Sequence, residues 1–427
     1  MLNKKNISIL YLSLLLCTKA IAQDIAFARK IVNDLCAPEM FGRGYVNKGQ
    51  QLAAAYIKTE FGAANVKPFK DGYEQFFGFQ AIAFPYNIDI KFDDKDLVVG
   101  EDVIVSSGCP QTKGVFSVFW IDSSTIDNPQ EFKEFERTPF YKTFLVVDAI
   151  KGKKLNNATA AQKILDNGYK AKGLIYANQT KLTASVSMDW DSYPILYIVK
   201  GAINRYQRNL KLDIQSEAND YGVQNIAGYI KGTQYPDSFI VITAHYDHLG
   251  KMGNYALFPG ANDNASGVAM MLDLMKTIQR KPLPYSVAFI AFAAEEIGLL
   301  GSLYYTENPL FPLQQISMLI NLDLMGTGDK GMTVVNATLF PEEFQDLQLI
   351  NLNGNYLPTV NPRGKAANSD HHYFTEKGVK AFYFYLMGEY KYYHDVNDTP
   401  SALTLSKYNE AFSLIYQFIR EYSTAKE

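Results

Sequence analysis

The sequence lacks a large excess of either charge, and it lacks long apolar runs. Its 427 residues are 20% charged and carry a formal net charge of −3 at pH 7. Nucleic acids and anionic membranes attract proteins through clustered basic charge, so this balance gives no reason to expect either as a partner. A membrane-spanning helix needs ~20 consecutive apolar residues, and we therefore expect no membrane span.

The N-terminus is typical of a cleavable signal peptide. A basic start is followed by a short apolar run at 7–17 and by the small-residue cleavage signature A-I-A, which ends at Ala22. We therefore expect residues 1–22 to be removed, the mature chain to begin near Gln23, and the protein to be secreted or periplasmic. A buried N-terminal helix is the alternative.

Cysteine is scarce, with three residues in the whole chain. Cys17 falls within the expected signal peptide, which leaves Cys36 and Cys109 in the mature protein. Export permits disulfides, and an even count permits a Cys36–Cys109 bridge. Two separate buried thiols are the alternative.

The pattern of apolar residues divides the rest of the chain into three parts. Residues 23–92 contain apolar residues at helical spacing, and we expect a helical segment that packs on the catalytic domain. Residues 93–217 mix buried-strand runs with a helical stretch and contain no histidine, so we interpret them as a small accessory domain. Residues 218–427 alternate strands and helices, which predicts an α/β fold with a mainly parallel sheet and helices on both faces.

All five histidines lie in the last part, and acidic residues follow its predicted strands. His245 and Asp247 follow the strand at 239–244, Glu295 and Glu296 follow that at 287–292, Asp323 follows that at 318–322, and His394 follows that at 379–386. Ligands of open α/β sheets bind at the carboxyl ends of the strands. We therefore expect these side chains to meet at one edge of the sheet.

The residue types match a catalytic zinc centre. Zinc takes imidazole nitrogen and carboxylate oxygen, and a catalytic site keeps a position open for water. Two histidines with three carboxylates suit two zinc ions per chain, ~3.5–4 Å apart, that share one carboxylate and one water. The five candidate ligands are His245, Asp263, Glu296, Asp323 and His394.

Two of the aspartates have an ordinary alternative role. Asp247 shares a strand face with His245 and could orient it by accepting its second ring N–H, although a surface His–Asp pair would look the same. Asp263 lies in a loop that opens the helix predicted at 264–279, where an aspartate is often an N-cap. Asn264 or Ser266 could cap that helix instead and leave Asp263 free for metal.

Adjacent Glu295 and Glu296 would divide the work of a hydrolytic site. One would bind metal, while the other would take a proton from the attacking water and pass it to the leaving amine. A solvated loop is the alternative, because neighbouring carboxylates repel each other.

Together, these residues resemble a known family. The motifs are A-H-Y-D-H-L-G from Ala244, G-A-N-D-N-A-S-G from Gly260, A-E-E-I-G-L-L-G-S from Ala294, N-L-D from Asn321, S-D-H from Ser369 and Y-H-D-V-N-D-T from Tyr393. Their order and spacing are similar to those of the co-catalytic zinc aminopeptidases of metallopeptidase family twenty-eight, which includes bacterial leucyl aminopeptidases. The motif E-M-F-G-R-G from Glu39 resembles the family's N-terminal lead-in. The middle part resembles its inserted protease-associated domain.

The resemblance implies a zinc exopeptidase fold, of the phosphorylase/hydrolase-like type, and assigns roles to residues. It divides the ligands between two zinc sites that share Asp263, with His245 and Asp323 in one and Glu296 and His394 in the other. Glu295 would be the general base, and Tyr393 would polarise the scissile carbonyl. The family also has a cis peptide after the bridging aspartate, here Asp263–Asn264.

The other polar residues near these motifs receive lesser roles. His371 and His372 compete with His394 as ligands, but the resemblance puts the S-D-H motif beside the substrate, so we expect His371 to line the substrate cleft. His248 is expected to form hydrogen bonds rather than to bind metal. Arg363 could hold a substrate carboxylate, although a lone loop arginine is usually solvated.

The predicted function is a secreted zinc-dependent exopeptidase. We expect an aminopeptidase that acts on peptides with a free N-terminus, in which a metal pair activates water and Glu295 transfers its proton. A carboxypeptidase or dipeptidase of the same family is the first alternative. A glutaminyl cyclase follows, and then a non-catalytic binding protein.

Overall fold

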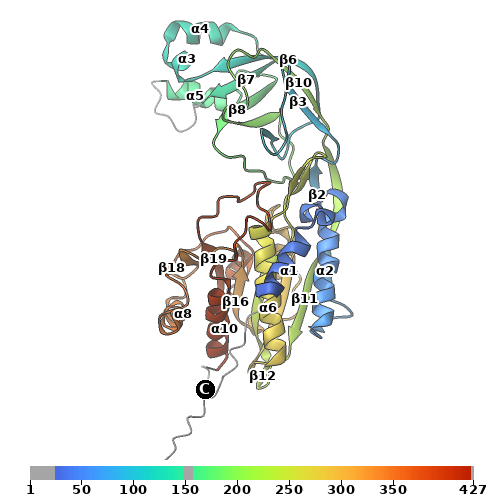
Figure 1. Ribbon diagram of the computed structural model, residues 1–427, viewed down its shortest axis with the longest axis vertical. Helices are drawn as coiled ribbons and strands as arrows, with labels where there is room; N and C mark the ends of the chain where they lie inside the picture. Colours follow the sequence, from blue (N-terminus) through green and yellow to red (C-terminus); the bar gives the residue numbers. More distant parts are fainter. Residues whose placement is uncertain (1–24, 149–156, 425–427) are drawn as a thin grey trace, which may run out of the picture.

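The computed structural model describes residues 25–148 and 157–424, which form two lobes stacked along the long axis of the molecule (Figure 1). The predicted signal peptide, residues 1–22, lies outside this part of the chain. Every helix in the described ranges is too short or too polar to span a bilayer.

The lower lobe in Figure 1 is built on a nine-stranded mixed sheet. Its strands are β1 (Lys67–Pro68), β2 (Glu74–Ala83), β11 (Glu217–Ile230), β12 (Tyr235–His245), β15 (Tyr285–Phe292), β16 (Ile316–Leu322), β17 (Gly331–Val335), β18 (Val360–Pro362) and β19 (Ala381–Met387). The central strands run in the order β15-β12-β16-β19 and are parallel. The flanking pairs β11–β15 and β17–β19 are antiparallel.

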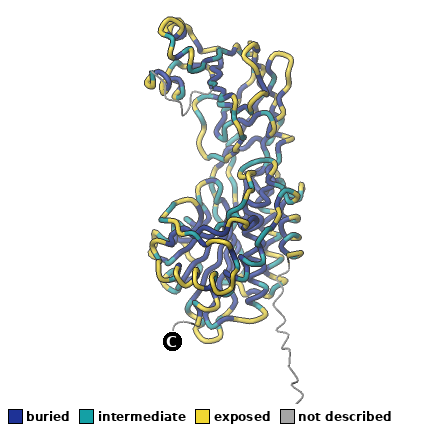
Figure 2. Tube along the Cα trace, turned by 60° about the vertical axis from the view of Figure 1, so that its left-hand side comes forward, coloured by how far each residue is buried: buried dark blue, intermediate teal, exposed yellow. Residues whose placement is uncertain are grey.

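Helices cover both faces of this sheet, because its central strands are apolar on both faces. Successive side chains of a strand point to opposite faces. In β12, Ile240 and Ile242 join the core under the helices of one face, whereas Phe239 and Val241 join the core of the other. The first face carries α1 (Ile25–Leu35), α2 (Gly49–Ala63), α6 (Ser266–Arg280), α8 (Pro341–Gly354) and α10 (Tyr408–Thr424), and the second carries α7 (Leu300–Glu307) and α9 (His371–Glu376). The α/β class is therefore confirmed, and Figure 2 shows the buried interior.

The helix predicted at 264–279 begins slightly later than expected. Residues Ala261–Ala265 form a separate turn in which Asp263 and Asn264 have non-helical backbone angles, and α6 starts at Ser266. The peptide bond between Asp263 and Asn264 is cis, as the resemblance implied. Asp263 is therefore not an N-cap of α6, but belongs to a loop in front of it.

The upper lobe contains an eight-stranded sheet with helices on one face. Its elements are β3 (Ile88–Phe92), β4 (Lys95–Asp96), β5 (Val103–Val105), β6 (Thr112–Ile121), α3 (Ser123–Asp127), α4 (Pro129–Arg137), β7 (Thr143–Asp148), α5 (Ala158–Leu165), β8 (Gly173–Gln179), β9 (Ile195–Val199) and β10 (Asn209–Ile214). The sheet thus spans residues 88–214, compared with the range 93–217 expected for the accessory domain.

The two lobes share an apolar core as well as chain connections. The hairpin β13–β14 (Gly250–Met252 and Ala256–Phe258) belongs in sequence to the lower lobe, yet Met252 and Phe258 are buried in a core of the upper one. Gly44 lies against this hairpin so closely that an added Cβ would come 2.5 Å from the Cα of Gly250. The N-terminal G-R-G motif is therefore packed where the two lobes meet.

The two cysteines of the described chain are free, buried thiols. Cys36 packs in the lower lobe and Cys109 in the upper one. The hypothetical Cys36–Cys109 bridge is therefore wrong, and the alternative of two separate buried thiols holds. Burial raises the pKa of each thiol to about 12, so both are poor nucleophiles.

Candidate metal centre

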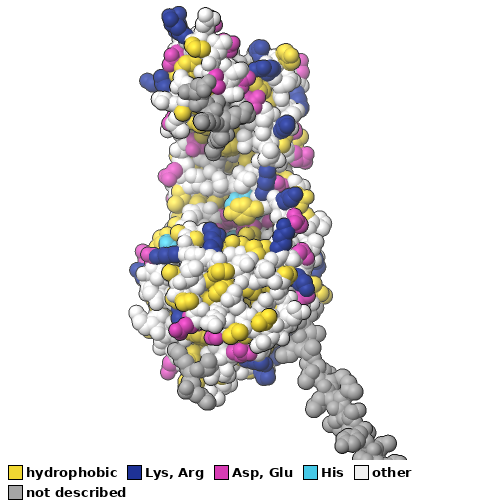
Figure 3. Space-filling model, turned by 90° about the vertical axis from the view of Figure 1, so that its left-hand side faces the viewer, with side chains coloured by type: hydrophobic (Ala, Val, Ile, Leu, Met, Phe, Trp, Pro, Cys, Tyr) yellow, Lys and Arg dark blue, Asp and Glu magenta, His cyan; other side chains and the backbone are white. Residues whose placement is uncertain are grey.

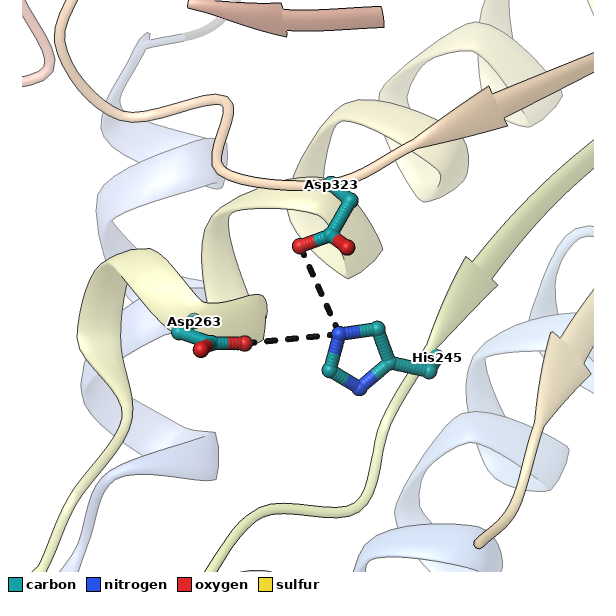
Figure 4. A group of neighbouring side chains, drawn as sticks. All are labelled: His245, Asp263 and Asp323. Atoms are coloured by element: carbon teal, nitrogen blue, oxygen red, sulfur yellow. Dashed lines mark ion pairs between the residues drawn. The ribbon is translucent and has the colours of Figure 1, made fainter. Parts of the chain in front are cut away.

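Three of the predicted ligands meet at the carboxyl edge of the large sheet. His245 ends β12, Asp323 follows β16, and Asp263 lies in the loop before α6 (Figure 4). His245 Nε2 lies 3.4 Å from Asp263 Oδ1 and 3.4 Å from Asp323 Oδ1. The three side chains are 1%, 5% and 8% exposed, respectively. Because these strands are parallel neighbours, their ends bring the His245 and Asp323 side chains together.

The other two predicted ligands approach Asp263 from its second oxygen. His394 Nε2 lies 3.2 Å from Asp263 Oδ2 and 3.0 Å from Glu296 Oε2. Asp263 therefore presents one oxygen to each histidine, in the arrangement of a bridging carboxylate. The structure brings all five predicted ligands into one cluster.

A third imidazole borders the cluster. His248 Nδ1 lies 2.6 Å from Glu296 Oε1, which agrees with the expectation that His248 forms a hydrogen bond. Ligand atoms of His248, Asp263 and Glu296 also lie within 4.8 Å of one another. Geometry alone thus offers His248 as well as His394 as a partner of Glu296.

The pKa values show that cationic and anionic groups in the cluster depend on each other. Burial would raise the pKa of Asp263, but the neighbouring imidazoles of His245 and His394 hold it well below its ordinary value. Burial would lower the pKa of His394, yet Glu296 and Asp263 raise it to about 11. The carboxylates therefore stabilise positive charge at this point, which a bound cation would also supply.

Asp323 is fixed by a chain of buried polar side chains. Ser369 Oγ donates to Asp323 Oδ2 at 2.9 Å, Asn321 Nδ2 donates to Ser369 Oγ at 2.8 Å, and Thr243 Oγ1 donates to Asn321 Oδ1 at 2.7 Å. The roles of Thr243, Asn321 and Ser369 were not predicted from the sequence. Asn321 and Ser369 lie in the quoted N-L-D and S-D-H motifs, so their position beside Asp323 was a usable signal.

Asp247 acts differently from the prediction. The Nδ1 atom of His245 lies 3.2 Å from the backbone carbonyl of Asp247 and 3.8 Å from its carboxylate. The carboxylate instead accepts backbone N–H groups of Glu295, at 3.1 Å, and Glu296, at 3.3 Å. Asp247 thus orients His245 through its main chain and holds the glutamate loop through its side chain.

Two further buried residues hold the Asp263 loop. Asp398 accepts the backbone N–H groups of Asn262, at 2.8 Å, and Asp263, at 3.1 Å. Arg43 is 0% exposed and donates to several main-chain carbonyls, namely those of Tyr246, Leu35, Pro259, Gly260 and Asp263. Both residues lie in motifs of the sequence, but their roles could not be predicted from it, because the partners are backbone groups of distant segments.

A pocket of about 310 Å³ opens beside the cluster. Its lining comprises His245, Asp263, Glu295, Glu296, Asp323, Leu324, Arg363, Asn368, Tyr383, Tyr385 and Tyr393. Figure 3 shows a recess between the lobes where a histidine and hydrophobic side chains reach the surface, with basic side chains nearby. The structure therefore brings Glu295, Tyr393 and Arg363 to the same pocket as the predicted ligands.

The predicted lining residue His371 lies apart from that pocket. It is fully buried, and its ring centroid is 5.3 Å from that of Tyr383. Tyr383 lines the pocket wall, so His371 packs beside a lining residue and is not itself one. Burial lowers the pKa of His371 to about 4, which keeps the imidazole neutral.

Glu295 has the environment of a carboxyl group with an elevated proton affinity. Burial raises its pKa well above the ordinary value, and the carboxylates of Glu296 and Asp323 add to this effect. The preceding residue, Ala294, has a φ of +57°, in the left-handed region that side chains other than glycine rarely adopt. Such backbone geometry is frequent at functional sites.

Comparisons with known proteins point to one peptidase family. The profile of peptidase family M28 matches residues 225–419. Aminopeptidase YwaD of Bacillus subtilis is 35% identical over 182 residues, which cover 41% of this chain and 37% of the relative. A probable zinc metalloprotease of Pyricularia oryzae is 34% identical over 113 residues, which cover 26% of this chain and 22% of the relative. The chain thus spans well under half the length of these curated relatives.

Two solved structures are similar over both lobes. The zinc aminopeptidase BSAP of Bacillus subtilis aligns with a TM-score of 0.69 at 19% identity, covering 94% of this chain and 96% of that one. An aminopeptidase of Aneurinibacillus sp. strain AM-1 aligns with a TM-score of 0.63 at 18% identity, covering 93% and 94%. At such identities the likeness shows the fold.

Proposed function

Because this chain belongs to peptidase family M28 through residues 225–419, we propose that it is a zinc-dependent aminopeptidase with two metal ions per chain. The observation that carries this proposal is the convergence of two imidazoles and two further carboxylates around Asp263. Nitrogen and carboxylate oxygen donors are the set that zinc takes in hydrolytic sites.

Two buried atoms of the cluster that make no hydrogen bond support the presence of a metal. Asp323 Oδ1 and His394 Nε2 are buried, yet neither makes a hydrogen bond, and buried polar atoms normally have a partner. His245, Asp263 and Asp323 would hold one zinc ion, and Asp263, Glu296 and His394 would hold the other. When bound, a zinc pair supplies Lewis acidity toward a carbonyl and lowers the pKa of water.

Within this proposal, Glu295 is the general base and acid. Its side chain lines the pocket without being assigned to either metal, and its raised pKa suits a group that accepts and later returns a proton. It would take the proton of the attacking water and deliver it to the departing amine. Tyr393, whose ring stacks on that of His394 at 3.9 Å, would donate a hydrogen bond to the carbonyl oxygen of the scissile bond.

The pocket favours the end of a peptide over an internal segment. Its volume of about 310 Å³ is at the lower limit of the ~300–1,000 Å³ typical of small-molecule sites. Four acidic side chains line it, and their charge would attract the ammonium group of a free N-terminus. Both features support aminopeptidase action.

A dipeptidase or carboxypeptidase is the second candidate, and Arg363 is the observation that favours it. This arginine lines the same pocket and lies 3.5 Å from the hydroxyl of Tyr385. A guanidinium group binds carboxylates in a bidentate manner, so it could hold the C-terminus of a very short substrate. Under the aminopeptidase proposal, Arg363→Met changes hydrolysis of an aminoacyl anilide little, because that substrate has no carboxylate.

The test of the proposed function is hydrolysis of an aminoacyl anilide, with an N-blocked peptide as the comparison. We expect turnover of the free-amine substrate only, abolished by a chelator and restored by zinc. Glu295→Gln should keep two zinc ions yet lose roughly 10²–10⁴-fold in kcat. Glu307→Gln, at an exposed position, is the matched control and should behave as wild type. Wild-type turnover by Glu295→Gln would contradict the base assignment.

We also propose that the protein is exported, on the basis of the N-terminal signal in residues 1–22. Expression of the full chain in a bacterium with a secretory pathway should yield a mature N-terminus near Gln23. A protein recovered in the cytoplasm with Met1 retained would contradict export.

A further inference from the structure

The upper lobe contacts the candidate metal centre at His394. The backbone N–H of Ala184 donates to the carbonyl oxygen of His394 at 3.0 Å, and Nδ1 of His394 lies 3.0 Å from the carbonyl oxygen of Ala184. A carbonyl oxygen can only accept, so Nδ1 carries the proton of this contact. Nε2 is thereby left to face Asp263 and Glu296.

Ala184 belongs to the upper lobe in both sequence and packing. It lies between β8 and β9 and is buried in the core shared by the upper sheet and the β13–β14 hairpin. In Figure 1, the red-brown segment between β19 and α10 rises toward the green segment that descends from the upper lobe. The contact therefore joins two lobes rather than two neighbouring loops of one.

The loop that carries His394 is held at two further points. Lys181 donates to the carbonyl oxygen of Tyr393, and its ammonium group lies 5.9 Å from the centre of the Tyr393 ring. Val396 packs against Gly100, where an added Cβ would come 2.9 Å from Val396 Cγ1. Gly100 and Lys181 both belong to the upper lobe, so together with Ala184 that lobe contacts this loop at three residues.

The backbone of His394 needs such support. Its φ is +57°, in a region that side chains other than glycine occupy at a cost and only where surrounding contacts require it. The hydrogen bond from Ala184 to the His394 carbonyl is one such contact. The loop geometry that aims Nε2 at Glu296 is thus maintained from outside the lower lobe.

We propose that residues 181–184, the clamp segment, position His394 for metal binding, and that this is a function of the upper lobe. Histidines that bind metal usually donate their second ring N–H to a carbonyl or carboxylate, which fixes the tautomer and the ring orientation. Here the accepting carbonyl is that of Ala184. Lys181 and Ala184 are positioning residues, and the inference rests on the proposed zinc function.

The first test displaces the clamp segment in the full-length protein. Ala184→Leu enlarges a side chain that is 3% exposed, whereas Thr183→Leu adds the same side chain at an exposed neighbouring position and serves as the control. Zinc titration should show two bound equivalents. Ala184→Leu should lower the affinity of only one of them, by roughly 10–100-fold, which is the usual effect of losing a group that hydrogen-bonds to a metal ligand. Thr183→Leu should bind both equivalents as wild type does.

The second test changes the lysine with less risk to folding. Lys181→Met should weaken the same zinc equivalent and speed amide hydrogen exchange in residues 391–398, while Lys181→Arg, which keeps a charged donor, should restore both. Lys200→Met, at an exposed position of the same lobe, is the control. Unchanged zinc affinity and unchanged exchange in both Ala184→Leu and Lys181→Met would overturn the proposal.

The readouts separate this inference from the proposed function. Hydrogen exchange in residues 391–398 is measured on the metal-free protein, so it reports the clamp even if no peptide is hydrolysed. Loss of both zinc equivalents together with a lowered Tm would indicate general unfolding and would count against a specific positioning role. If residues 391–398 of the wild-type protein were protected from exchange but the protein had no peptidase activity, the proposed function would be rejected instead.

Discussion

The two halves of the candidate metal centre are held in different ways. The inner half, His245 and Asp323, comes from adjacent parallel strands. Asp323 is held by Ser369, which precedes α9, and Ser369 is in turn held by Asn321 of β16. The outer half, Glu296 and His394, comes from loops, and the nearest support of His394 is a carbonyl of the other lobe. Asp263 joins the two halves.

The exposure of the two histidines follows the same division. The side chain of His245 is 1% exposed and that of His394 is 12% exposed. Strand ends are fixed by ladder hydrogen bonds and by two packed cores, whereas loop positions depend on fewer contacts. We therefore expect the inner half to bind zinc more tightly and the outer half to exchange it more readily.

The largest effect should come from deleting one imidazole from each half. His245→Ala should weaken the tight zinc equivalent by more than the roughly 100-fold that loss of an outer partner costs. His394→Ala should weaken only the other equivalent. His248→Ala distinguishes the roles of the two imidazoles beside Glu296, since this variant should still bind both zinc equivalents. If His394→Ala still bound two zinc equivalents and His248→Ala lost one, His248 and not His394 would be the ligand beside Glu296.

A large effect on stability should come from Arg43, which supports both halves through the Asp263 loop. Arg43→Met leaves several buried carbonyls without a donor, at a cost of about 1–3 kcal/mol for each, so we expect at least about 3 kcal/mol of lost unfolding free energy. Denaturant unfolding of the metal-free protein measures this. Arg280→Met, at an exposed helix end, is the control. Equal stability of the two variants would show that the carbonyls find other partners.

A smaller effect on zinc affinity should come from Ser369, which supports the inner half alone. Ser369→Ala removes the hydroxyl that donates to Asp323, and we expect roughly tenfold weaker binding of the tight zinc equivalent with the other unchanged. Competition with a chromogenic chelator measures both. Ser401→Ala, at an exposed site, should have no effect. Weakening of the outer equivalent instead would mean that the halves are not supported separately.

The smallest effect should be a dependence of the Tm on pH in the metal-free protein, and it should arise from the outer half of the centre. The pKa of His394 is raised from 6.5 to about 11. The contribution of protonated His394 to the stability of the folded state is therefore complete below pH 6.5 and is lost as the pH rises toward 11. The pKa of Glu296 is lowered from 4.5 to about 2, so its stabilisation is complete above pH 4.5 and is lost as the pH falls toward 2. The Tm of the metal-free protein should therefore fall above pH 6.5, and less steeply in His394→Gln. Parallel curves for the two proteins would contradict this.

The inner half was the easier one to predict from sequence. A residue that directly follows an apolar strand run must lie at a sheet edge, so His245 and Asp323 could be placed by the pattern alone. The same reasoning brought Glu295 and Glu296 to that edge. The mixed sheet and the helix over most of 264–279 also followed from apolar spacing.

The outer supports could not be predicted in this way. The acceptor for His394 is a main-chain carbonyl, which every residue has, so nothing in the letter sequence marks Ala184. The partners of Arg43 are also carbonyls, and Asp247 uses its side chain on backbone N–H groups of the glutamate loop. His371 was expected at the cleft from its motif alone, whereas packing puts Tyr383 there.

The central claim is that one cluster binds two zinc ions around a shared aspartate. Anomalous diffraction at the zinc edge, from crystals of the zinc-loaded protein, tests it most directly. The account predicts two peaks, each about 2.0–2.2 Å from its ligand atoms, with His245 and Asp323 at one, His394 and Glu296 at the other, and Asp263 at both. A single peak, or a second peak bound by His248 in place of His394, would contradict it.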